Sequence, residues 1–549
     1  MVGWYDPIQL GRTAVDVATS TLFGKNADYR LMEALATPDS DDIRETAGGK
    51  AADENGIYPF DDADSIWIDY VSDTGDGWNS TYAVAHSVGR EFLEVEGAGK
   101  LPRGQVLILG GDEVYPVAHR NVYRDRLVEP FESALANSGD SFPHVFAVPG
   151  NHDWYDSLVS FTRLFCSQRW FGGWKTCQQR SYFAIRLPQH WWLIGTDVQL
   201  ESDIDIPQVK YFKKVAAQML PEDRIILCTA EPHWIYATIY GKDDADITED
   251  NLAFLENKIF CRKISVFLSG DLHHYRRHAD SEGRQKITAG GGGAFLHPTH
   301  GPDVSVLEDG YRLQAAYPSV SDSKKIAWGN LAFLFKNWKF GLLTAVLYTL
   351  TCWSVMADMS QFGVHDTWHA IKTVIHASIS KPAPVFWIGA VFLGFVFFTD
   401  THSKAYRFIA GPIHGLAHLA CMFAIGWAAT YLTVTANHPF QSVYQLLPAG
   451  AIIFVMGWIV GAIVMGLYLL ISLNVFKRHA NEAFSALASP DWKNFLKLRI
   501  DSDGSLTIFP IGIRRVPRRW QETNAIPRFE PHDTNATPPA LIETPIVIK

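Results

Sequence analysis

The chain has 549 residues, more than one ordinary domain requires, and a formal net charge of −10. This acidic balance, with no basic stripe interleaved with aromatic residues in the first half, gives no indication of nucleic-acid binding, so we expect no nucleic-acid partner. The six cysteines are scattered and form no CxxC pair, which argues against a structural zinc site or a disulfide framework.

Residues 1–60 predict an N-terminal segment outside the main folded domains. The first residues lack the basic start and the apolar stretch of a signal peptide. They are compatible with an amphipathic helix lying on a membrane and equally with an ordinary surface helix. The stretch 37–65 is rich in Asp, Gly and Ala, which is typical of an exposed, mobile loop.

Residues 61–335 have the pattern of a water-soluble α/β domain. Helical segments are predicted at 80–95 and 206–220, and they alternate with strands, which indicates layered sheets and helices. Six segments combine an apolar run with a polar or glycine-rich end, and they lie at residues 65–73, 105–116, 144–153, 223–234, 263–275 and 285–300.

The first five strand ends all carry Asp, Asn or His. In open α/β sheets, ligands bind at the carboxyl ends of the strands. A mixture of carboxylate, amide and imidazole groups without thiolates favours two ions of Mn, Fe or Zn over a structural zinc. Two neighbouring cations also need a carboxylate between them to offset their repulsion. The residues concerned are Asp73, Asp112, Asn151, His152, Asp153, His233, Asp271 and His273.

These strand ends form an ordered series of motifs, which are Asp73-Thr-Gly75, Gly111-Asp112-Glu-Val-Tyr115, Gly150-Asn151-His152-Asp153, His233 and Gly270-Asp-Leu-His273. The series resembles the calcineurin-like metallophosphoesterase superfamily over roughly residues 60–300. The resemblance implies a four-layer α-β-β-α sandwich and a dinuclear metal centre. It would place Asp73 and His273 on the first metal, with Asp112 between the two. Asn151 and His233 would hold the second metal, and His152 would contact the phosphate or assist the leaving group.

Two motifs depart from the pattern of many members. Gly75 stands where a His is common, but purple acid phosphatases also carry Asp-x-Gly followed by Gly-Asp-x-x-Tyr. That likeness implies Tyr115 as a ligand of the first metal, with Asp76 as the competing candidate. In the last motif, Asp271 replaces the first His of Gly-His-x-His and would keep the second metal coordinated as a hard ligand.

Other residues near the strand ends have two interpretations each. Arg276 and His297 are candidates for substrate binding, and a solvated surface position is the alternative for both and for His300. His274 is expected behind the ligands or at the surface. The Gly290–Gly293 run would allow close approach of the backbone to a ligand, or would form a mobile loop.

Residues 336–478 predict a transmembrane domain of four helices, the two shortest of which could instead be re-entrant. Basic residues flank the spans on the side of the N-terminal domain, and the loop after the third span is uncharged. This bias predicts an integral protein of the plasma or an inner membrane, with the phosphoesterase-like domain in the cytoplasm. Each apolar span is near or above the roughly 20 residues that cross a bilayer core, and they lie at 340–358, 384–400, 408–434 and 444–474.

His414 and His418 lie one helical turn apart inside the third span. They could be ligands of a metal or haem on one helix face, or a hydrogen-bonded pair facing the interior of the bundle.

Residues 479–522 predict a cytosolic hairpin with its turn at Asp503-Gly504, followed by a basic cluster at Arg514–Arg519. The cluster suits anionic lipid head groups or a pairing with the acidic first domain. Residues 523–549, rich in Pro and Thr, predict a disordered tail.

The sequence therefore predicts a membrane-anchored phosphoesterase that uses two divalent or mixed-valence metal ions and activated water. The substrate would be a phosphoester, either a lipid phosphate or lipid-linked diphosphate, or a soluble ester. The alternative is a non-catalytic receptor or scaffold with a degenerate metal site, an interpretation supported by Gly75 and Asp271.

Overall fold

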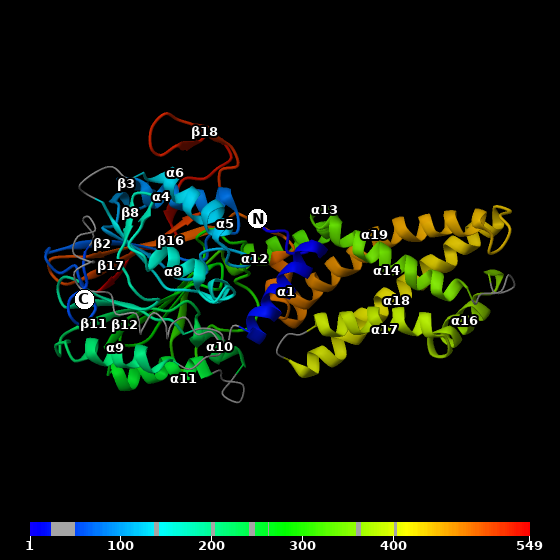
Figure 1. Ribbon diagram of the computed structural model, residues 1–549, viewed down its shortest axis with the longest axis horizontal. Helices are drawn as coiled ribbons and strands as arrows, with labels where there is room; N and C mark the ends of the chain where they lie inside the picture. The colour runs from blue at the N-terminus through cyan, green and yellow to red at the C-terminus, as the bar shows by residue number, and fades with distance from the viewer. Residues whose placement is uncertain are drawn as a thin grey trace. The chain divides into compact units, whose positions relative to one another are not determined.

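The computed structural model describes residues 1–23, 50–136, 142–198, 204–240, 247–261, 263–357, 364–399 and 403–549 (Figure 1). The chain folds as two compact units. The first comprises residues 1–2, 12–323 and 488–549, and the second comprises residues 3–11 and 324–487. The predicted division into 61–335, 336–478 and a separate C-terminal segment is therefore wrong at the C-terminus, because residues after 488 belong to the first unit.

The first unit contains a nine-stranded sheet built around three parallel strands, β2 (Ile66–Val71), β5 (Val106–Leu109) and β6 (His144–Ala147). Their side chains alternate between two cores. Val106 and Ile108 face the second sheet, whereas Leu107 and Leu109 face the helices. This period of two is the one that a strand buried on both faces requires.

An eight-stranded sheet is the second layer of strands. Its order is β1 (Ile57–Pro59), β9 (Phe183–Arg186), β10 (Trp191–Gly195), β11 (Arg224–Cys228), β12 (Ile264–Ser269), β14 (Gln285–Ala289), β13 (Tyr275–Ala279) and β15 (Arg312–Tyr317). The six predicted strands are thus confirmed. Because β1 pairs with β9, the predicted linker 1–60 is wrong at its end. The part of the predicted loop before residue 50 lies outside the described residues.

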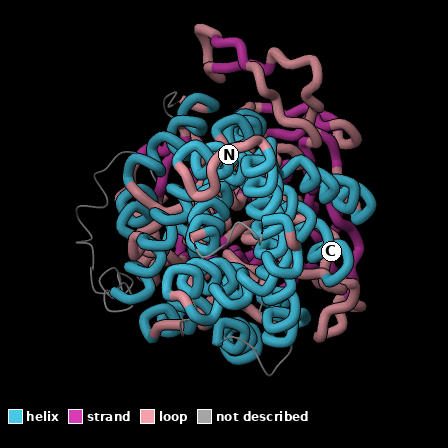
Figure 2. Tube along the Cα trace, turned by 90° about the vertical axis from the view of Figure 1, so that its right-hand side faces the viewer, coloured by secondary structure: helices cyan, strands magenta, loops and turns pink. Residues whose placement is uncertain are grey.

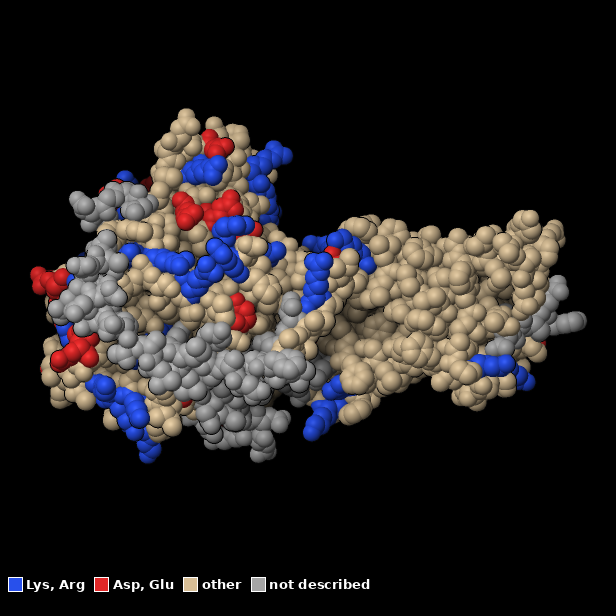
Figure 3. All heavy atoms as spheres, in the orientation of Figure 1, with Lys and Arg blue, Asp and Glu red and all other residues tan. Residues whose placement is uncertain are grey.

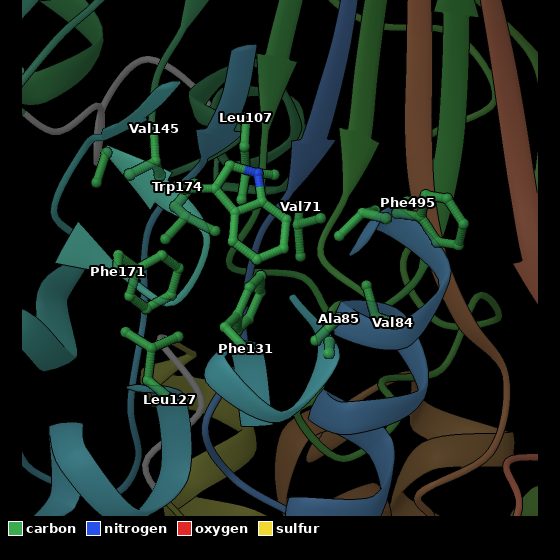
Figure 4. Close-up of a cluster of buried hydrophobic side chains, with 14 of the residues drawn as sticks. Val71, Val84, Ala85, Leu107, Leu127, Phe131, Val145, Phe171, Trp174 and Phe495 are labelled. Carbon is green, nitrogen blue, oxygen red and sulfur yellow. The ribbon is translucent and has the colours of Figure 1, made fainter. Parts of the chain in front are cut away.

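Three apolar cores hold these layers together. One lies between the sheets, and another joins the eight-stranded sheet to α9 (Ile206–Ala216), α10 (His233–Tyr240) and α11 (Ile247–Phe254). The third joins the nine-stranded sheet to α4 (Trp78–Gly89), α6 (Glu129–Ala134) and α8 (Val159–Phe165). In that core the indole of Trp174 lies between Leu107 of β5 and Phe131 of α6 (Figure 4).

The predicted helix 80–95 is too long. It ends at Gly89, and the remainder forms β3 (Phe92–Val95), which pairs with β4 (Gly99–Pro102). The segment Phe92–Val95 alternates exposed and buried residues, the pattern of a strand with one face in water.

The predicted C-terminal hairpin is confirmed as β16 (Lys493–Ile500) and β17 (Leu506–Ile513). It does not stand alone, because β16 pairs with β2 and so extends the nine-stranded sheet. The predicted disorder of 523–549 is wrong. The tail forms β19 (Phe529–Pro531), which pairs with β18 (Trp520–Glu522), and two strands that pair with β17, which are β20 (Ala540–Leu541) and β21 (Ile546–Ile548). The β18–β19 ribbon projects from the first unit in both views (Figure 1, Figure 2).

The second unit contains three helices long and apolar enough to cross a membrane, α14 (Trp338–Met356), α18 (Lys404–Thr435) and α19 (Val443–Phe476). The predicted span 384–400 corresponds to α17 (Pro382–Phe398), which is bent by 91° from α16 (Thr367–Ser380). The described residues therefore provide three candidate spans, or four if the bent pair is one span.

The two histidines of α18, His414 and His418, form a hydrogen-bonded pair. The Nε2 atoms of His414 and His418 are 3.2 Å apart, and the Tyr348 hydroxyl lies 2.9 Å from His418 Nδ1. All three residues are buried within the helical unit. Of the two predicted interpretations, the arrangement matches the pair that faces the interior of the bundle.

We predict that Lys497→Met destabilises the first unit by about 3–5 kcal/mol, because it leaves the buried Asp69 carboxylate without its cation. The Lys497 Nζ atom lies 2.7 Å from Asp69 Oδ1, and both side chains are buried. Denaturant unfolding of the full-length protein, followed by tryptophan fluorescence, measures the change. The matched control is Arg499→Met on the same strand, which removes an ion pair with Asp501 and a contact with the Trp67 ring from a side chain that is not buried. Equal unfolding midpoints for the two variants would contradict the prediction.

Candidate metal centre

Three of the predicted ligands follow strands in an unusual backbone conformation. Asp73, Asp112 and Asp271 have φ values of 60°, 51° and 64°. Residues with side chains rarely adopt this left-handed conformation, which costs on the order of 1–3 kcal/mol and is found preferentially at functional sites. The neighbouring glycines make room for the carboxylates, since a Cβ atom at Gly150 would meet Asp112 and one at Gly270 would meet Asp73.

The hydroxyl of Tyr115 lies at the centre of three predicted ligands. It is 2.9 Å from Asp73 Oδ1, 3.0 Å from Asp112 Oδ2 and 2.9 Å from His273 Nε2. A phenol has one proton and can donate it to one of these acceptors only. The other two acceptors receive no proton from Tyr115, and a bound cation would satisfy their lone pairs.

Burial disfavours the charged forms of Asp73, Asp112 and His273. Burial, followed by the charge of Asp271, raises the pKa of Asp73 well above its ordinary value. Burial and then the charge of Asp73 do the same to the pKa of Asp112. Burial also holds the pKa of His273 well below its ordinary value, so its imidazole is neutral and able to donate a lone pair.

Asp76, the competing ligand, is engaged elsewhere. Its Oδ1 accepts a hydrogen bond from the backbone N–H of Val2 at 2.7 Å, and its Oδ2 accepts one from the backbone N–H of Phe295 at 2.9 Å. Asp76 thus joins the N-terminus to the glycine-rich segment. The structure brings Tyr115, rather than Asp76, together with Asp73 and His273.

His273 is held in place from two sides. Its Nδ1 donates to the carbonyl of Phe295 at 2.7 Å, which leaves Nε2 facing Tyr115. The ring of His297 stacks on it with centroids 3.9 Å apart, and His297 Nδ1 accepts the backbone N–H of His273. His297 therefore supports a predicted ligand, and its contact with substrate stays a prediction.

The residues predicted for the second metal lie in separate local contacts. The Asn151 amide donates to the Tyr155 hydroxyl at 3.2 Å, and the Tyr236 hydroxyl donates to the Asp271 carboxylate. His233 opens α10, and its Nε2 is buried with no hydrogen-bond partner. Burial lowers the pKa of His233 to about 3, so it presents a neutral nitrogen.

His152 has one ring nitrogen committed. Nδ1 lies 2.6 Å from the carbonyl of Pro116 and must carry the proton to donate to it, which leaves Nε2 as the nitrogen that can accept. Burial lowers the pKa of His152 to about 4. The ring packs against Tyr115 with centroids 4.4 Å apart, and the backbone N–H donates to Asp112 Oδ1.

The solvated alternatives for Arg276 and His300 are wrong, since both side chains are buried. Arg276 donates to the carbonyl of Thr299 at 3.0 Å, and His300 Nδ1 lies 2.7 Å from the Ser323 hydroxyl. His274 is buried as well, where burial and the charge of Arg276 hold its pKa well below the ordinary value. A role of Arg276 in binding substrate stays a prediction.

Sequence reasoning named Asp153 but missed that it holds the ligands in place, and it missed Tyr236 and Lys493 altogether. Asp153 accepts the backbone N–H groups of Gly150 at 2.9 Å and Glu113 at 3.3 Å, so it ties together two ligand-bearing turns. Its position inside the Gly-Asn-His-Asp motif was a usable signal. Tyr236 lies one helical turn after His233 and could have been found in the same way. No local signal identifies the buried Lys493, whose Nζ donates to the carbonyl of Ala294.

Among the described residues, no three His, Cys, Asp and Glu side chains are arranged to hold a metal ion. Tyr115 offers a further type of ligand, because its hydroxyl lies where Asp73, Asp112 and His273 converge. The donor chemistry fits a cation bound by oxygen and nitrogen, and the partnerless Nε2 of His233 fits one as well.

Comparison with known proteins gives one family match. Residues 66–276 match the family model described as calcineurin-like phosphoesterase, and no curated protein matches the chain. Three solved structures are similar. GAP50, the anchor in the inner membrane complex of Plasmodium, is 14% identical with a TM-score of 0.31, covering 42% of this chain and 74% of that chain. Purple acid phosphatase PPD1 from seeds of yellow lupin (Lupinus luteus) is 12% identical with a TM-score of 0.30, covering 44% and 46%. PhoD is 10% identical with a TM-score of 0.28, covering 43% and 59%.

We predict that protein loaded with ferric iron shows a visible charge-transfer absorption that Tyr115→Phe removes together with part of the bound metal. The phenol oxygen is the only difference between the two side chains, so its loss isolates the ligand. Asp76→Asn, whose carboxylate faces the backbone, should keep both the absorption and the metal. Absorption spectra and elemental analysis provide the measurements. A colourless iron-loaded wild type, or metal loss confined to the Asp76 variant, would reverse the choice between these ligands.

Proposed function

Because residues 66–276 form a calcineurin-like phosphoesterase domain, we propose that this chain is a metal-dependent phosphoesterase that hydrolyses its substrate with activated water. The observation that carries the proposal is the convergence of Asp73, Asp112 and His273 on the Tyr115 hydroxyl. When more buried hydrogen-bond acceptors meet than there are protons to share among them, a bound cation is needed to offset their negative charge.

We further propose that the two sheets and their outer helices form the four-layer α-β-β-α sandwich that the motifs imply. The predicted ligands then come from both sheets. Asp73, Asp112 and Asn151 follow β2, β5 and β6 of one sheet, and His233 and Asp271 follow β11 and β12 of the other. A site at the carboxyl ends of parallel strands is where such sheets bind ligands.

The first metal would be held by Asp73, Tyr115 and His273, the second by Asn151, His233 and Asp271, and Asp112 would lie between them. A pair of divalent cations supplies charge neutralisation at a phosphoryl group and a water acidified for attack. The chain itself contributes His152. With Nδ1 held by Pro116, Nε2 is the atom that can exchange a proton with a phosphate oxygen or the leaving group.

A non-catalytic receptor or scaffold is the second candidate. It is favoured by the absence, within the described residues, of a ready three-residue metal group, and by Asp271, whose carboxylate is already engaged by Tyr236. Metal content and hydrolysis of a generic aryl phosphate distinguish the two candidates.

The helical unit supports attachment to a membrane through three or four apolar helices. We propose four crossings, with the phosphoesterase domain in the cytoplasm. Both β2, before the helices, and β16, after them, belong to one sheet, so both lie on the same side of the membrane. An even number of crossings follows. A site tethered in this way suits a lipid phosphate or a lipid-linked diphosphate, with a soluble phosphoester as the alternative substrate.

We predict that His152→Ala lowers kcat by roughly 10²–10⁴ while metal content stays near that of the wild type, because proton transfer is lost without loss of a ligand. Asp112→Asn is the matched comparison and should lose both hydrolysis and metal. Steady-state kinetics on an aryl phosphate and elemental analysis measure the two effects. Loss of metal in the His152 variant would instead make this residue a ligand, and unchanged turnover in the Asp112 variant would refute the bridging role.

For topology, we predict that a cysteine introduced by Lys404→Cys, at the start of α18, is labelled by an impermeant reagent only after cells are permeabilised. The control is His438→Cys, in the uncharged loop after α18, which should be labelled in intact cells. Position 404 begins α18 and position 438 follows it, so the two cysteines report on which side of the membrane each end of this helix lies. Labelling of position 404 from outside intact cells would reverse the proposed orientation.

A further inference from the structure

A cavity with arginine side chains in its wall lies in the first unit, apart from the predicted metal ligands. It has a volume of 460 Å³, and four arginines contribute to its wall. The polar residues of its wall include Arg120, Asn121, Tyr123, Arg124, Arg163 and Arg169. In a chain with a net charge of −10, this is a strong local excess of positive charge.

Three of the four arginines have no ion-pair partner among the residues that the structure describes. Arg124 pairs with Asp125 at 2.7 Å, in an exposed contact. Within the part of the chain that the structure describes, no carboxylate lies within ion-pair distance of Arg120, Arg163 or Arg169. Figure 3 shows Lys and Arg side chains gathered on the face where Figure 1 places α5 (Arg120–Tyr123) and α8.

The arginines come from three different places in the fold, so they are not the solvated face of one helix. Arg120 and Arg124 belong to the helical turns that follow the Asp112 loop, and Arg163 lies on α8, after the Asn151 loop. Arg169 precedes β7 (Trp170–Phe171). Like charges brought together by the fold repel one another, which is unfavourable unless an anion joins them.

We propose that this cavity binds a ligand carrying two or more phosphate groups. Guanidinium groups bind phosphate oxygens through paired hydrogen bonds, and Arg is the residue type suited to this geometry. Four cationic side chains exceed what a single phosphate group neutralises, and the amide of Asn121 adds a donor to the same wall. The site is distinct from the metal centre, since none of its residues is a predicted metal ligand.

Tyr123 connects the cavity with the metal centre. It lines the cavity, and its hydroxyl donates to Asp153 Oδ1 at 2.5 Å. Asp153 in turn accepts the backbone N–H groups of Gly150 and Glu113, each adjacent to a predicted ligand. Tyr123 is therefore linked through Asp153 to the turn that carries Asn151 and, by a second hydrogen bond, to the turn that carries Asp112.

The experiment is calorimetric titration of the full-length protein in neutral detergent with inorganic pyrophosphate, in the presence of EDTA. In Arg163→Gln/Arg169→Gln the affinity should fall by roughly tenfold for each guanidinium removed. Arg312→Gln, an exposed arginine on β15, is the matched charge control and should bind as the wild type does. Because these arginines are exposed, thermal unfolding should be the same for all variants.

Asp112→Asn should also bind pyrophosphate with unchanged affinity, which separates this site from the proposed catalytic centre. If the protein turned out not to hydrolyse phosphoesters, the pyrophosphate titration would still test this site, since the titration is carried out without metal. Equal affinity of the double variant and the wild type would overturn the proposal. So would loss of binding in Asp112→Asn.

The source of the phosphate groups is tested by reconstituting the protein into phosphatidylcholine vesicles with and without phosphatidylinositol bisphosphate. Displacement of pyrophosphate by the doped vesicles, abolished in Arg163→Gln/Arg169→Gln, would identify a lipid head group. Pyrophosphate binding that is equal in both vesicles would identify a soluble ligand. Each of these outcomes supports the site, whereas displacement that persists in the double variant overturns it.

Discussion

The interaction on which the first unit depends is the meeting of buried carboxylates around one phenol hydroxyl. Asp73 and Asp112 lie at the ends of adjacent parallel strands, and both contact Tyr115. Backbone N–H groups of Asp271 and His152 are directed at the same carboxylates. Buried negative charge is tolerated only where donors and cations surround it. The left-handed turns and the adjacent glycines are the backbone conditions for that arrangement.

The C-terminal hairpin contributes to the same electrostatic balance. Lys493 and Lys497 are four residues apart on β16, so they lie on one face of the strand. Lys497 pairs with Asp69 of β2, and Lys493 donates to the segment that positions His273. Burial lowers the pKa of Lys493 to about 8. Two buried cations thus come from a part of the chain that follows the long apolar helices.

The strands and their polar ends were predictable from the sequence, because an apolar run that stops at Gly and Asp is a local signal. Asp153 and Tyr236 were predictable as well. Asp153 lies two residues after the predicted ligand Asn151, and Tyr236 lies one helical turn after the predicted ligand His233. The roles of Asp76 and Tyr115 were not separable, since Asp76 is engaged by Val2 and Phe295 only in the folded chain. The ordered tail was missed for a related reason. Its composition is that of a linker, but Leu541 and Ile546 complete a sheet edge formed elsewhere.

The pairing of β16 with β2 has a consequence for the biosynthesis of the protein. During synthesis, β2 emerges early, whereas its neighbour β16 is made only after the helices that are long and apolar enough to cross a membrane. Until then, one side of β2 is an open edge with unpaired backbone groups, a template for aggregation. On the proposed topology, β16 reaches β2 only after insertion of the helices has returned the chain to the side of the membrane from which it started. On that topology, correct membrane insertion is a condition for completing the sheet, and a misinserted chain would leave the edge of β2 open to proteolysis and quality control.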